Sequence, residues 1–381
     1  MYNKGTRLLL AGKNEKAIQC FKKQLKEFEF KECYLNMGNA YRNSDMDDKA
    51  IECYIKANSP DIPYGGGGYS TYPLALNNLG LMMYSYGNVD QAIALYEQAV
   101  ALSPNYGEAL WNLGNARLKR SNCVEGWDLY EYRFDRGPGS VVINNNIKAW
   151  DEVSCGDRIC VVTEQGLGDR IMFGRYLDKL KDYFKEIVVV CPPGLEEIYA
   201  PYKTTEYAEG TVSIPMCSLA RIFGITSEKW VKTEFEKYEF TKGKLNIGVV
   251  STGSTTHVNN RNRSCPGHHM SGLARFGNLY GLNPSDPKLR NVSTLAPKTW
   301  RETASYCKGL DVIVSVDTSI VHLAGTLGVP VIMVQPKKES DFRWGMPGMK
   351  NVWYDSVHVV HNENNWDKAF ESVHAMLDAI C

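Results

Sequence analysis

The sequence lacks any long, uninterrupted apolar run. Stretches such as 311–316 and 329–334 have the length of a strand, far below the ~20 residues that a transmembrane helix needs. The first apolar run, at 8–11, is too short to be the core of a signal peptide. These absences predict a cytoplasmic protein with no membrane span.

The chain also lacks a net charge, because 43 basic and 43 acidic residues cancel. Proteins that bind nucleic acid or anionic lipid through their overall field usually carry a large charge of one sign. Nucleic acid is therefore not a favoured partner, although a local basic stripe is compatible with this total. Hydrophobic residues at 44% and charged residues at 23% exclude wholesale disorder or a fibre. A length of 381 residues predicts two or three domains.

No C-x-x-C pair occurs among the eleven cysteines. An odd count in a long chain favours reduced, buried thiols over a disulfide framework. Cys265, His268 and His269 lie close together, but no second ligand pair follows at a spacing typical of zinc sites. A flexible loop at 267–272 and no metal site are the prediction.

The first third of the sequence contains an internal repeat. Four glycines each stand sixteen residues before an aromatic residue, and the steps between the glycines are 33, 42 and 34 residues. The long step includes 60–72, with glycines at 65–68, which predicts an inserted loop. The pairs are Gly5 and Phe21, Gly38 and Tyr54, Gly80 and Tyr96, and Gly114 and Tyr130.

The segment 73–106 resembles a tetratricopeptide repeat, whose period is about 34 residues. It carries the family's small, aromatic and proline positions at Leu76, Leu79, Gly80, Ala92, Tyr96, Ala99 and Pro104. The resemblance implies paired antiparallel helices in an α-solenoid over 1–136. In this interpretation the small residues let the two helices of a pair approach, and the aromatic fills the groove between pairs. The solenoid either recognises a partner or acceptor, or only supports the fold.

After residue 136 the pattern changes to apolar strands separated by helical stretches. The predicted strands are 158–163, 186–191, 245–251, 311–316 and 329–335. Continuous apolar strands that alternate with helices predict parallel sheets covered on both faces. The fold class is therefore an α-solenoid followed by α/β lobes. A linker at 144–146 and 148–150 would lead into two Rossmann-like lobes, at 145–240 and 244–381, with ligands at the carboxyl ends of their strands.

The segment 317–330 carries the strongest chemical signal. Asp317 follows a buried strand, and Thr318 and Ser319 are suited to start a helix. A helix that starts at the end of a strand directs free N–H groups and partial positive charge at a ligand, which favours diphosphate. Asp317 would accept hydrogen bonds from sugar hydroxyls, and His322 would donate to phosphate or ribose. The alternative is a helix cap with a buried core histidine.

Three further segments follow predicted strands. The first lobe contributes Glu164, Gln165, Gly166, Gly168 and Asp169, and the second contributes Gly253, Arg261, Arg263 and Ser264 after its first strand, and Arg343 after 329–335. Glycines allow tight turns there, and the arginines suit a loop over diphosphate. The aromatic residues of 342–354 would lie near a base or sugar.

These segments, in this order, resemble the ADP-heptose:lipopolysaccharide heptosyltransferase superfamily of glycosyltransferases (family 9), and especially its members fused to tetratricopeptide repeats. The resemblance implies a GT-B fold, with the nucleotide-sugar donor on the second lobe and the acceptor on the first. It implies an inverting, metal-independent transfer of a hexosyl, heptosyl or pentosyl group, with no cofactor beyond the nucleotide sugar as co-substrate. Many members have tryptophan where Ser251 or Thr252 stands, which leaves donor preference open.

By the same resemblance, Asp169 is the candidate general base. Its alternative role is the N-cap of a helix beginning near Ile171, in which case Glu164 is the next candidate base. Residues matching the donor-phosphate and sugar segment are Asp317, Thr318, Ser319 and His322, and those matching the loop that steadies the leaving diphosphate are Arg261, Arg263 and Ser264.

Two competing functions stay open at this point. One is an adaptor built on the repeats, with inactive transferase lobes. The other is a glycosyltransferase that acts on protein side chains or modified DNA bases, because a repeat surface can present a macromolecule to the lobes.

Overall fold

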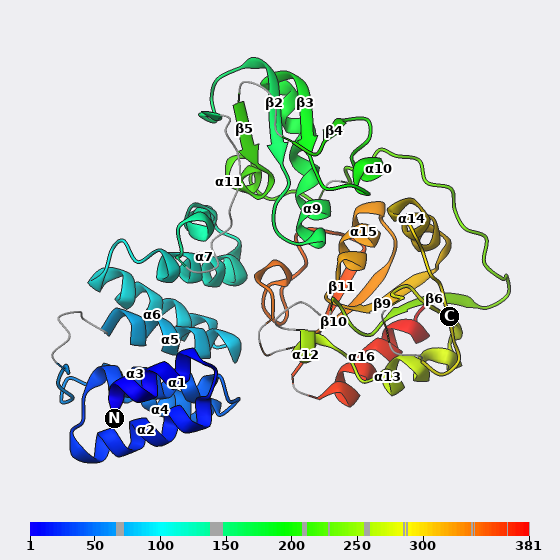
Figure 1. The fold of residues 1–381 in the computed structure, drawn as a ribbon. Helices are drawn as coiled ribbons and strands as arrows, with labels where there is room; N and C mark the ends of the chain where they lie inside the picture. The colour runs from blue at the N-terminus through cyan, green and yellow to red at the C-terminus, as the bar shows by residue number, and fades with distance from the viewer. Residues whose placement is uncertain are drawn as a thin grey trace. The chain divides into compact units, whose positions relative to one another are not determined.

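The computed structural model describes residues 1–65, 72–137, 148–207, 212–227, 229–254, 260–284, 286, 289–336, 338, 340–363 and 365–380. The chain divides into two compact units, Met1–Ser140 (unit 1) and Val141–Cys381 (unit 2) (Figure 1). The first part of the predicted linker, 144–146, and glycines 66–68 of the predicted loop lie outside the described residues. The second part, 148–150, is wrong as a linker, because Lys148 and Ala149 form an edge strand and Trp150 is buried. Among those residues, no helix combines the length and apolarity needed to cross a bilayer.

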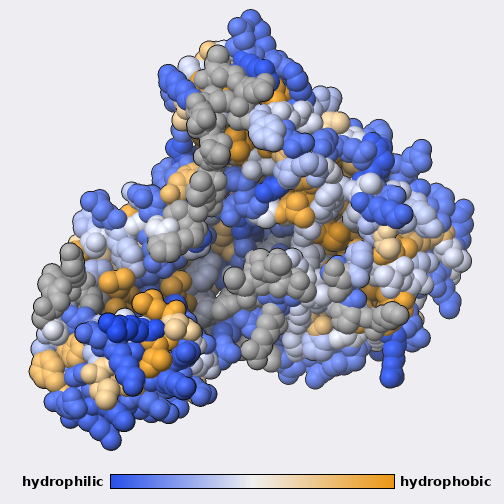
Figure 2. All heavy atoms as spheres, in the orientation of Figure 1, coloured by the Kyte–Doolittle hydropathy of each residue, from blue (hydrophilic) through white to orange (hydrophobic). Residues whose placement is uncertain are grey.

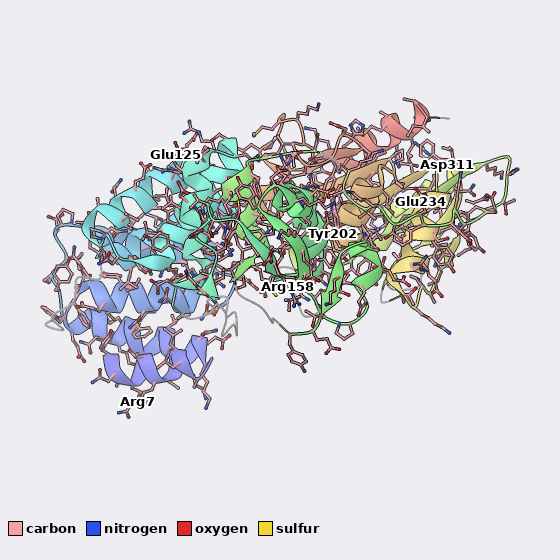
Figure 3. The ribbon with its side chains drawn as sticks, turned by 90° about the horizontal axis from the view of Figure 1, so that it is seen from above. Arg7, Glu125, Arg158, Tyr202, Glu234 and Asp311 are labelled. Atoms are coloured by element: carbon pink, nitrogen blue, oxygen red, sulfur yellow. The ribbon has the colours of Figure 1, made fainter. Side chains whose placement is uncertain are left out.

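Unit 1 consists of helices that follow one another in pairs, as the repeat predicts (Figure 1). The helices are α1 (Tyr2–Leu10), α2 (Asn14–Glu27), α3 (Lys31–Arg42), α4 (Asp47–Asn58), α5 (Tyr72–Ser85), α6 (Val89–Leu102), α7 (Gly107–Ser121) and α8 (Val124–Tyr130), with a final 3-10 turn at Glu131–Phe134. Charged side chains such as Arg7 and Glu125 point away from the helices (Figure 3). Figure 2 shows hydrophobic patches among hydrophilic residues on the visible face of this unit.

In the first three repeats the glycine lies directly under the aromatic residue of its own helix pair, whereas Gly114 lies against the backbone of Leu129 and Tyr130. A Cβ atom at Gly80 would approach the Tyr96 ring to 2.6 Å, and one at Gly38 would approach the Tyr54 ring to 2.7 Å. Both rings are fully buried or nearly so. Each of these rings thus covers the space that its own glycine leaves, and its role in the groove between pairs stays a prediction.

Asparagine side chains join neighbouring pairs in unit 1. The Asn78 amide on α5 donates to Oδ1 of Asn39 on α3 at 2.9 Å, and the Asn112 amide on α7 donates to Oδ1 of Asn77 on α5 at 2.8 Å. Buried amides need partners of this kind. The first helices of successive pairs are thus linked by polar contacts as well as by apolar packing.

The first lobe of unit 2 contains a five-stranded parallel sheet in the order β1-β5-β2-β3-β4. The strands are β1 (Lys148–Ala149), β2 (Gly156–Val162), β3 (Phe184–Val190), β4 (Lys203–Thr205) and β5 (Val212–Pro215). Short helices follow them: α9 (Leu167–Phe173), with a 3-10 continuation at Gly174–Asp182, α10 (Glu196–Tyr199), and α11 (Leu219–Phe223), preceded by a 3-10 turn at Met216–Ser218.

The second lobe contains a six-stranded parallel sheet in the order β11-β10-β9-β6-β7-β8. Its strands are β6 (Leu245–Val250), β7 (Gly277–Gly281), β8 (Val292–Thr294), β9 (Val312–Val316), β10 (Val331–Pro336) and β11 (Val357–Asn362). Its helices are α12 (Asn260–Arg263), α13 (Gly267–Gly272), α14 (Trp300–Gly309), α15 (Ser319–Leu327) and α16 (Trp366–Asp378), with 3-10 turns at Leu273–Arg275 and Phe342–Trp344. This strand order is that of a Rossmann fold.

The predicted fold class is confirmed: a helical repeat region is followed by two Rossmann-like α/β lobes. Every residue of β9 and β10 is buried, which explains why these strands read as continuous apolar runs. The predicted loop at 267–272 is wrong, because these residues form α13. Pro266 leads into that helix in an extended conformation, and Met270 anchors it in the core.

Each sheet has a point at which the strand order reverses. In the first lobe it lies between β2 and β5, and in the second between β6 and β9. Ligands of open α/β sheets bind outside the carboxyl ends of the strands at such points. The segments that follow β2, β6 and β9 are therefore the first places to look for a site.

Candidate functional site

The two lobes of unit 2 touch where α9 meets α15 (Figure 1). Gly168 and His322 face each other closely here, since a Cβ atom at Gly168 would lie 2.6 Å from Cδ2 of the histidine ring. Glycine is needed here because any side chain would push the two helices apart. The segment after β2 and the helix after β9 are thereby brought together.

His322 is packed inside this contact. Its exposed fraction is 5%, its ring stacks on Trp344 with centroids 5.0 Å apart, and Nδ1 lies 2.9 Å from the Tyr354 hydroxyl. Burial, followed by the positive charge of Arg343, lowers the pKa of His322 to about 3. The ring is therefore neutral at physiological pH, and its part in donor binding stays a prediction that would use Nε2.

Asp169 lies in the first turn of α9, two residues inside the helix start rather than at its N-cap. The helix begins at Leu167, earlier than the predicted start near Ile171, because Gly166 is the N-cap and its N–H donates to Oδ2 of Asp169 at 3.0 Å. The predicted alternative, an N-cap role for Asp169, is therefore wrong. Asp169 lies at the third helical position, and its side chain accepts a hydrogen bond from the N–H of the N-cap residue Gly166.

The other oxygen of Asp169 forms an ion pair with Arg343 of the second lobe. The two side chains are only 17% and 10% exposed. Burial raises the pKa of Asp169, and the charge of Arg343 opposes that rise. This pair joins the switch point of the first lobe to the segment that follows β10.

Asp341 fixes the direction of the Arg343 side chain. Nη1 of Arg343 donates to both carboxylate oxygens of Asp341 at 2.9 Å, and the Arg343 backbone N–H donates to the same carboxylate at 2.9 Å. Burial acts to raise the pKa of Asp341, but the Arg343 guanidinium and this N–H hold it below its usual range. Sequence reasoning named Arg343 and missed Asp341, whose only signal is its position two residues before the arginine.

Asp317 lies between the end of β9 and the start of α15. Burial, and then the negative charge of Asp341, raises its pKa to about 6. Thr318 is the N-cap, but no side chain caps the helix among the described residues, and Oγ1 of Thr318 lies 3.2 Å from Oγ of Ser315 instead. The backbone at Ser319 therefore begins a helix whose first N–H groups have no side-chain cap, a feature suited to an anion.

The segment after β6 is organised by Asn260, which sequence reasoning did not single out. Its Oδ1 accepts from the Gly253 N–H at 3.1 Å and from Nε of Arg263 at 3.3 Å. A Cβ atom at Gly253 would lie 2.2 Å from Nη2 of Arg263, so glycine makes room for the guanidinium. Ser264 closes the turn through its hydroxyl, 2.7 Å from that of Thr252.

The guanidinium of Arg263 also interacts electrostatically with the Asp317 carboxylate. Burial lowers the pKa of Arg263, and the charges of Asp317 and Asp341 oppose that change. The predicted residues after β6, β9 and β10 are thus neighbours. Arg261 belongs to α12, but its side chain lies outside the described residues, as do 255–259.

Glu164 and Gln165 form the turn between β2 and α9. Glu164 is 5% exposed and accepts from the Cys217 N–H at 3.2 Å, which ties the end of β2 to the turn that follows β5. Gln165 has φ of 64°, a left-handed conformation that costs energy for a residue other than glycine. Their contact with an acceptor stays a prediction.

The aromatic residues expected near a base or sugar are in the core instead. Trp344, Trp353 and Tyr354 are each 2% exposed or less. They pack around His322 and Phe173, and the Trp353 carbonyl accepts from Nη1 of Arg175 at 2.7 Å. They hold the lobes together and present no open stacking surface.

Comparison with known proteins identifies the repeats. Residues 31–59 match the family model of the tetratricopeptide repeat, and residues 80–120 match a second TPR repeat model. Unit 1 contains tetratricopeptide repeats. No curated protein sequence matches the chain.

Several solved structures are similar to part or most of this chain. MamA is 25% identical, with a TM-score of 0.30 over 35% of this chain and 75% of its own. The glycosyl transferase family 9 protein of Veillonella parvula is 12% identical, with a TM-score of 0.41 over 58% and 90%. Thermobaculum terrenum O-GlcNAc transferase is 11% identical, with a TM-score of 0.36 over 98% and 88%. All three TM-scores lie below 0.5, so the function of unit 2 has to be inferred from its own residues.

Proposed function

We propose that unit 2 is a glycosyltransferase that moves a sugar from a nucleoside diphosphate to an acceptor hydroxyl with inversion. The observation that carries this proposal is the meeting of two switch points. Arg263 and the start of α15 flank the switch point of the second lobe, and Arg343 links them to Asp169 at that of the first.

The donor diphosphate would bind at the start of α15. The backbone at Thr318 and Ser319 supplies N–H groups without a side-chain cap, and Arg263 lies nearby. A diphosphate gains negative charge as the bond to the anomeric carbon breaks, and fixed N–H groups and guanidinium stabilise that charge. Raised in pKa to about 6, Asp317 is partly protonated in mildly acidic solution, which lessens its repulsion of the phosphates.

Asp169 would act as the general base. Its pKa is raised by burial, so it accepts a proton more readily than an exposed aspartate. In the substrate-free protein its carboxylate is held by Arg343. Donor phosphates offer Arg343 a second anionic partner. Movement of the Arg343 side chain toward them would break its ion pair with Asp169 and leave that carboxylate available to the acceptor hydroxyl.

In this mechanism Asp169 takes the proton of the acceptor hydroxyl as its oxygen attacks the anomeric carbon. The bond from that carbon to the phosphate oxygen breaks, and the nucleoside diphosphate leaves with the electron pair. Arginines and helix N–H groups provide the compensation for charge that a metal ion gives elsewhere, so the proposal needs no metal and no further cofactor. The acceptor would be a small molecule or a macromolecule held by unit 1.

A panel of nucleotide sugars tests the proposal. The full chain is incubated with UDP-, GDP-, ADP- and dTDP-linked sugars, and binding and release of nucleotide are measured. We expect one nucleotide class to bind and its sugar to be slowly transferred to water or to an added acceptor. Failure of every donor to bind would favour the alternative in which unit 1 is an adaptor and the lobes are inactive.

A further inference from the structure

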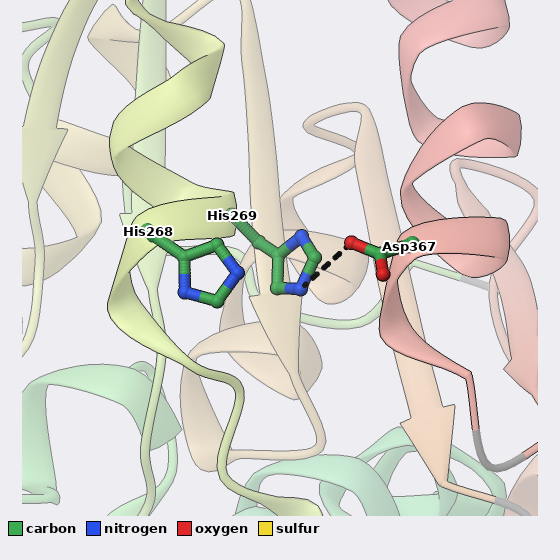
Figure 4. Close-up of side chains that lie close together, drawn as sticks. All are labelled: His268, His269 and Asp367. Atoms are coloured by element: carbon green, nitrogen blue, oxygen red, sulfur yellow. Dashed lines mark ion pairs between the residues drawn. The ribbon is translucent and has the colours of Figure 1, made fainter.

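Two histidines and an aspartate meet on the second lobe, away from the residues discussed so far. His268 and His269 belong to α13, and Asp367 lies in the first turn of α16 (Figure 4). One ligand-type atom from each of the three side chains lies within 4.8 Å of the others. The sequence showed the histidine pair but not its third member, which lies almost a hundred residues later.

His269 is the fixed member of this group. Its side chain is 9% exposed, its ring stacks on Phe370 with centroids 4.7 Å apart, and Nε2 lies 3.8 Å from Oδ1 of Asp367. A ring nitrogen of His269 therefore faces the Asp367 carboxylate from a fixed position, and imidazole nitrogens are common ligands of metal ions.

The side chains of His268 and Asp367 are exposed to solvent and can change their rotamers. The rings of His268 and His269 lie with centroids 4.1 Å apart, and Asp367 is 89% exposed. Around tetrahedral zinc, ligand atoms at ~2.0–2.1 Å from the metal are separated by about 3.4 Å. Small rotations of the two exposed side chains would bring the three atoms to that separation, with a fourth position left for water.

The nearby cysteine is not suited to join them. Burial raises the pKa of the Cys265 thiol far above its usual range, and its Sγ contacts the Pro266 carbonyl at 3.4 Å. Metal ions bind the thiolate and not the thiol. The donor set is therefore two imidazoles and one carboxylate, which suits zinc and similar divalent transition metals.

We propose that His268, His269 and Asp367 bind one divalent transition metal ion of the zinc type. Such an ion would tie α13 to α16. Because α13 follows Arg263 by only a few residues, the ion would also restrain the segment that carries this arginine. The inference does not depend on the proposed transferase activity.

Zinc titration by calorimetry tests the site. The full chain is first stripped with a chelator and carries Cys155→Ser, which removes an exposed thiol that would bind zinc non-specifically. We expect one zinc ion per chain, and an affinity at least about tenfold weaker in both Asp367→Asn and His268→Gln, since each removes one of three ligands.

Matched controls use the same residue types at neighbouring places. Glu371→Gln removes an exposed carboxylate one turn further along α16, and His358→Gln removes an exposed imidazole on β11. Both should bind zinc as the parent does. Equal zinc affinity in Asp367→Asn and Glu371→Gln, or no stoichiometric binding by the parent, would overturn the proposal.

Two further measurements separate the possible outcomes. Zinc should raise the melting temperature of the parent but not that of Asp367→Asn, because only the folded chain brings α13 and α16 together. Cobalt(II) in place of zinc should give a spectrum without a thiolate charge-transfer band. A strong thiolate band would assign the ion to cysteine and refute this ligand set.

Discussion

Unit 1 and the second unit differ in how far apart in sequence their decisive contacts lie. In unit 1, Gly80 meets Tyr96 within one helix pair, and the same spacing recurs at Gly38 and Tyr54. In unit 2, Asp169 meets Arg343 across two lobes. Contacts within a repeat join residues at a constant spacing, which can be seen in the sequence. Contacts between two lobes join residues that are brought together only by the tertiary fold, so no spacing marks them.

The sharpest way to test the second half of this comparison is to remove one charge from the contact between the lobes. In Asp169→Asn we expect transfer to fall at least about a hundredfold, because an amide cannot accept the proton. The amide oxygen still accepts from the Gly166 N–H, but the nearly buried ion pair with Arg343 is lost, so the melting temperature should also fall. Near-normal turnover in a rate assay would leave Asp169 a helix-start residue only and make Glu164 the next candidate.

Replacing Arg263 tests whether the segment after β6 serves the same site. Loss of a charge-assisted hydrogen bond in Arg263→Ala should weaken nucleotide binding by about 1.5–3 kcal/mol. Calorimetry with the preferred nucleoside diphosphate measures this. Arg275→Ala, an exposed arginine on the same lobe, is the control and should bind normally. Unchanged affinity in the Arg263 variant would remove it from the donor site.

Gly168→Ala tests the packing of α9 on α15. The added methyl group overlaps the His322 ring, and overpacking of this kind costs about 1–3 kcal/mol of unfolding free energy. Nucleotide affinity should fall with it, since the same helix starts carry the site. Gly166→Ala is the control, because its Cβ would meet only Asp169 Oδ2, at 3.4 Å. Denaturant unfolding and calorimetry distinguish the two, and equal behaviour would contradict the close contact.

Gly80→Ala makes the equivalent change in unit 1. Its methyl group overlaps the Tyr96 ring, so a loss of up to about 1–3 kcal/mol is expected for the unfolding of this unit. Nucleotide affinity should stay the same, in contrast to Gly168→Ala. Gln98→Ala, at an exposed position of α6, should affect neither quantity. A fall in nucleotide affinity in the Gly80 variant would mean that the units are coupled.

A change of pH should act on the stability of unit 2 through Asp317. The pKa of Asp317 is about 6 in the folded protein against an ordinary value of 3.8, so the folded state binds this proton more tightly. Its stabilising contribution is therefore present at low pH and is lost as pH rises from about 4 to 6. Unfolding of the parent, compared with Asp317→Asn across this range, should show that loss. Parallel profiles would contradict the raised pKa.

Much of the fold was visible in the sequence for physical reasons that these contacts illustrate. The repeat follows from a glycine and an aromatic that touch within each of the first three pairs, and β6, β9 and β10 follow from strands buried on both faces. The edge strands β1, β4 and β8 have three residues or fewer and leave no apolar run. α13 was missed because its anchor, Met270, gains meaning only from the core it enters.

In the candidate site, the sequence predicted those residues that directly follow strands. Arg263 and Asp317 follow strands of the second lobe, and Asp169 follows a strand of the first; a parallel sheet gathers such residues at the carboxyl ends of its strands. Asp341 and Asn260 were not found, because both act on another side chain rather than on a ligand, and nothing in their sequence surroundings marks them. Asp367 beside His269 depends on the packing of two helices distant in sequence.

The contact between Gly253 and Arg263 has an evolutionary consequence. The guanidinium occupies the place where a side chain at 253 would begin, so a side chain there has to displace it. A lineage that gains a side chain at 253 must shorten or redirect residue 263. In natural variants of this chain, arginine in this position at 263 should therefore occur with glycine at 253, whereas glycine at 253 is compatible with shorter residues at 263.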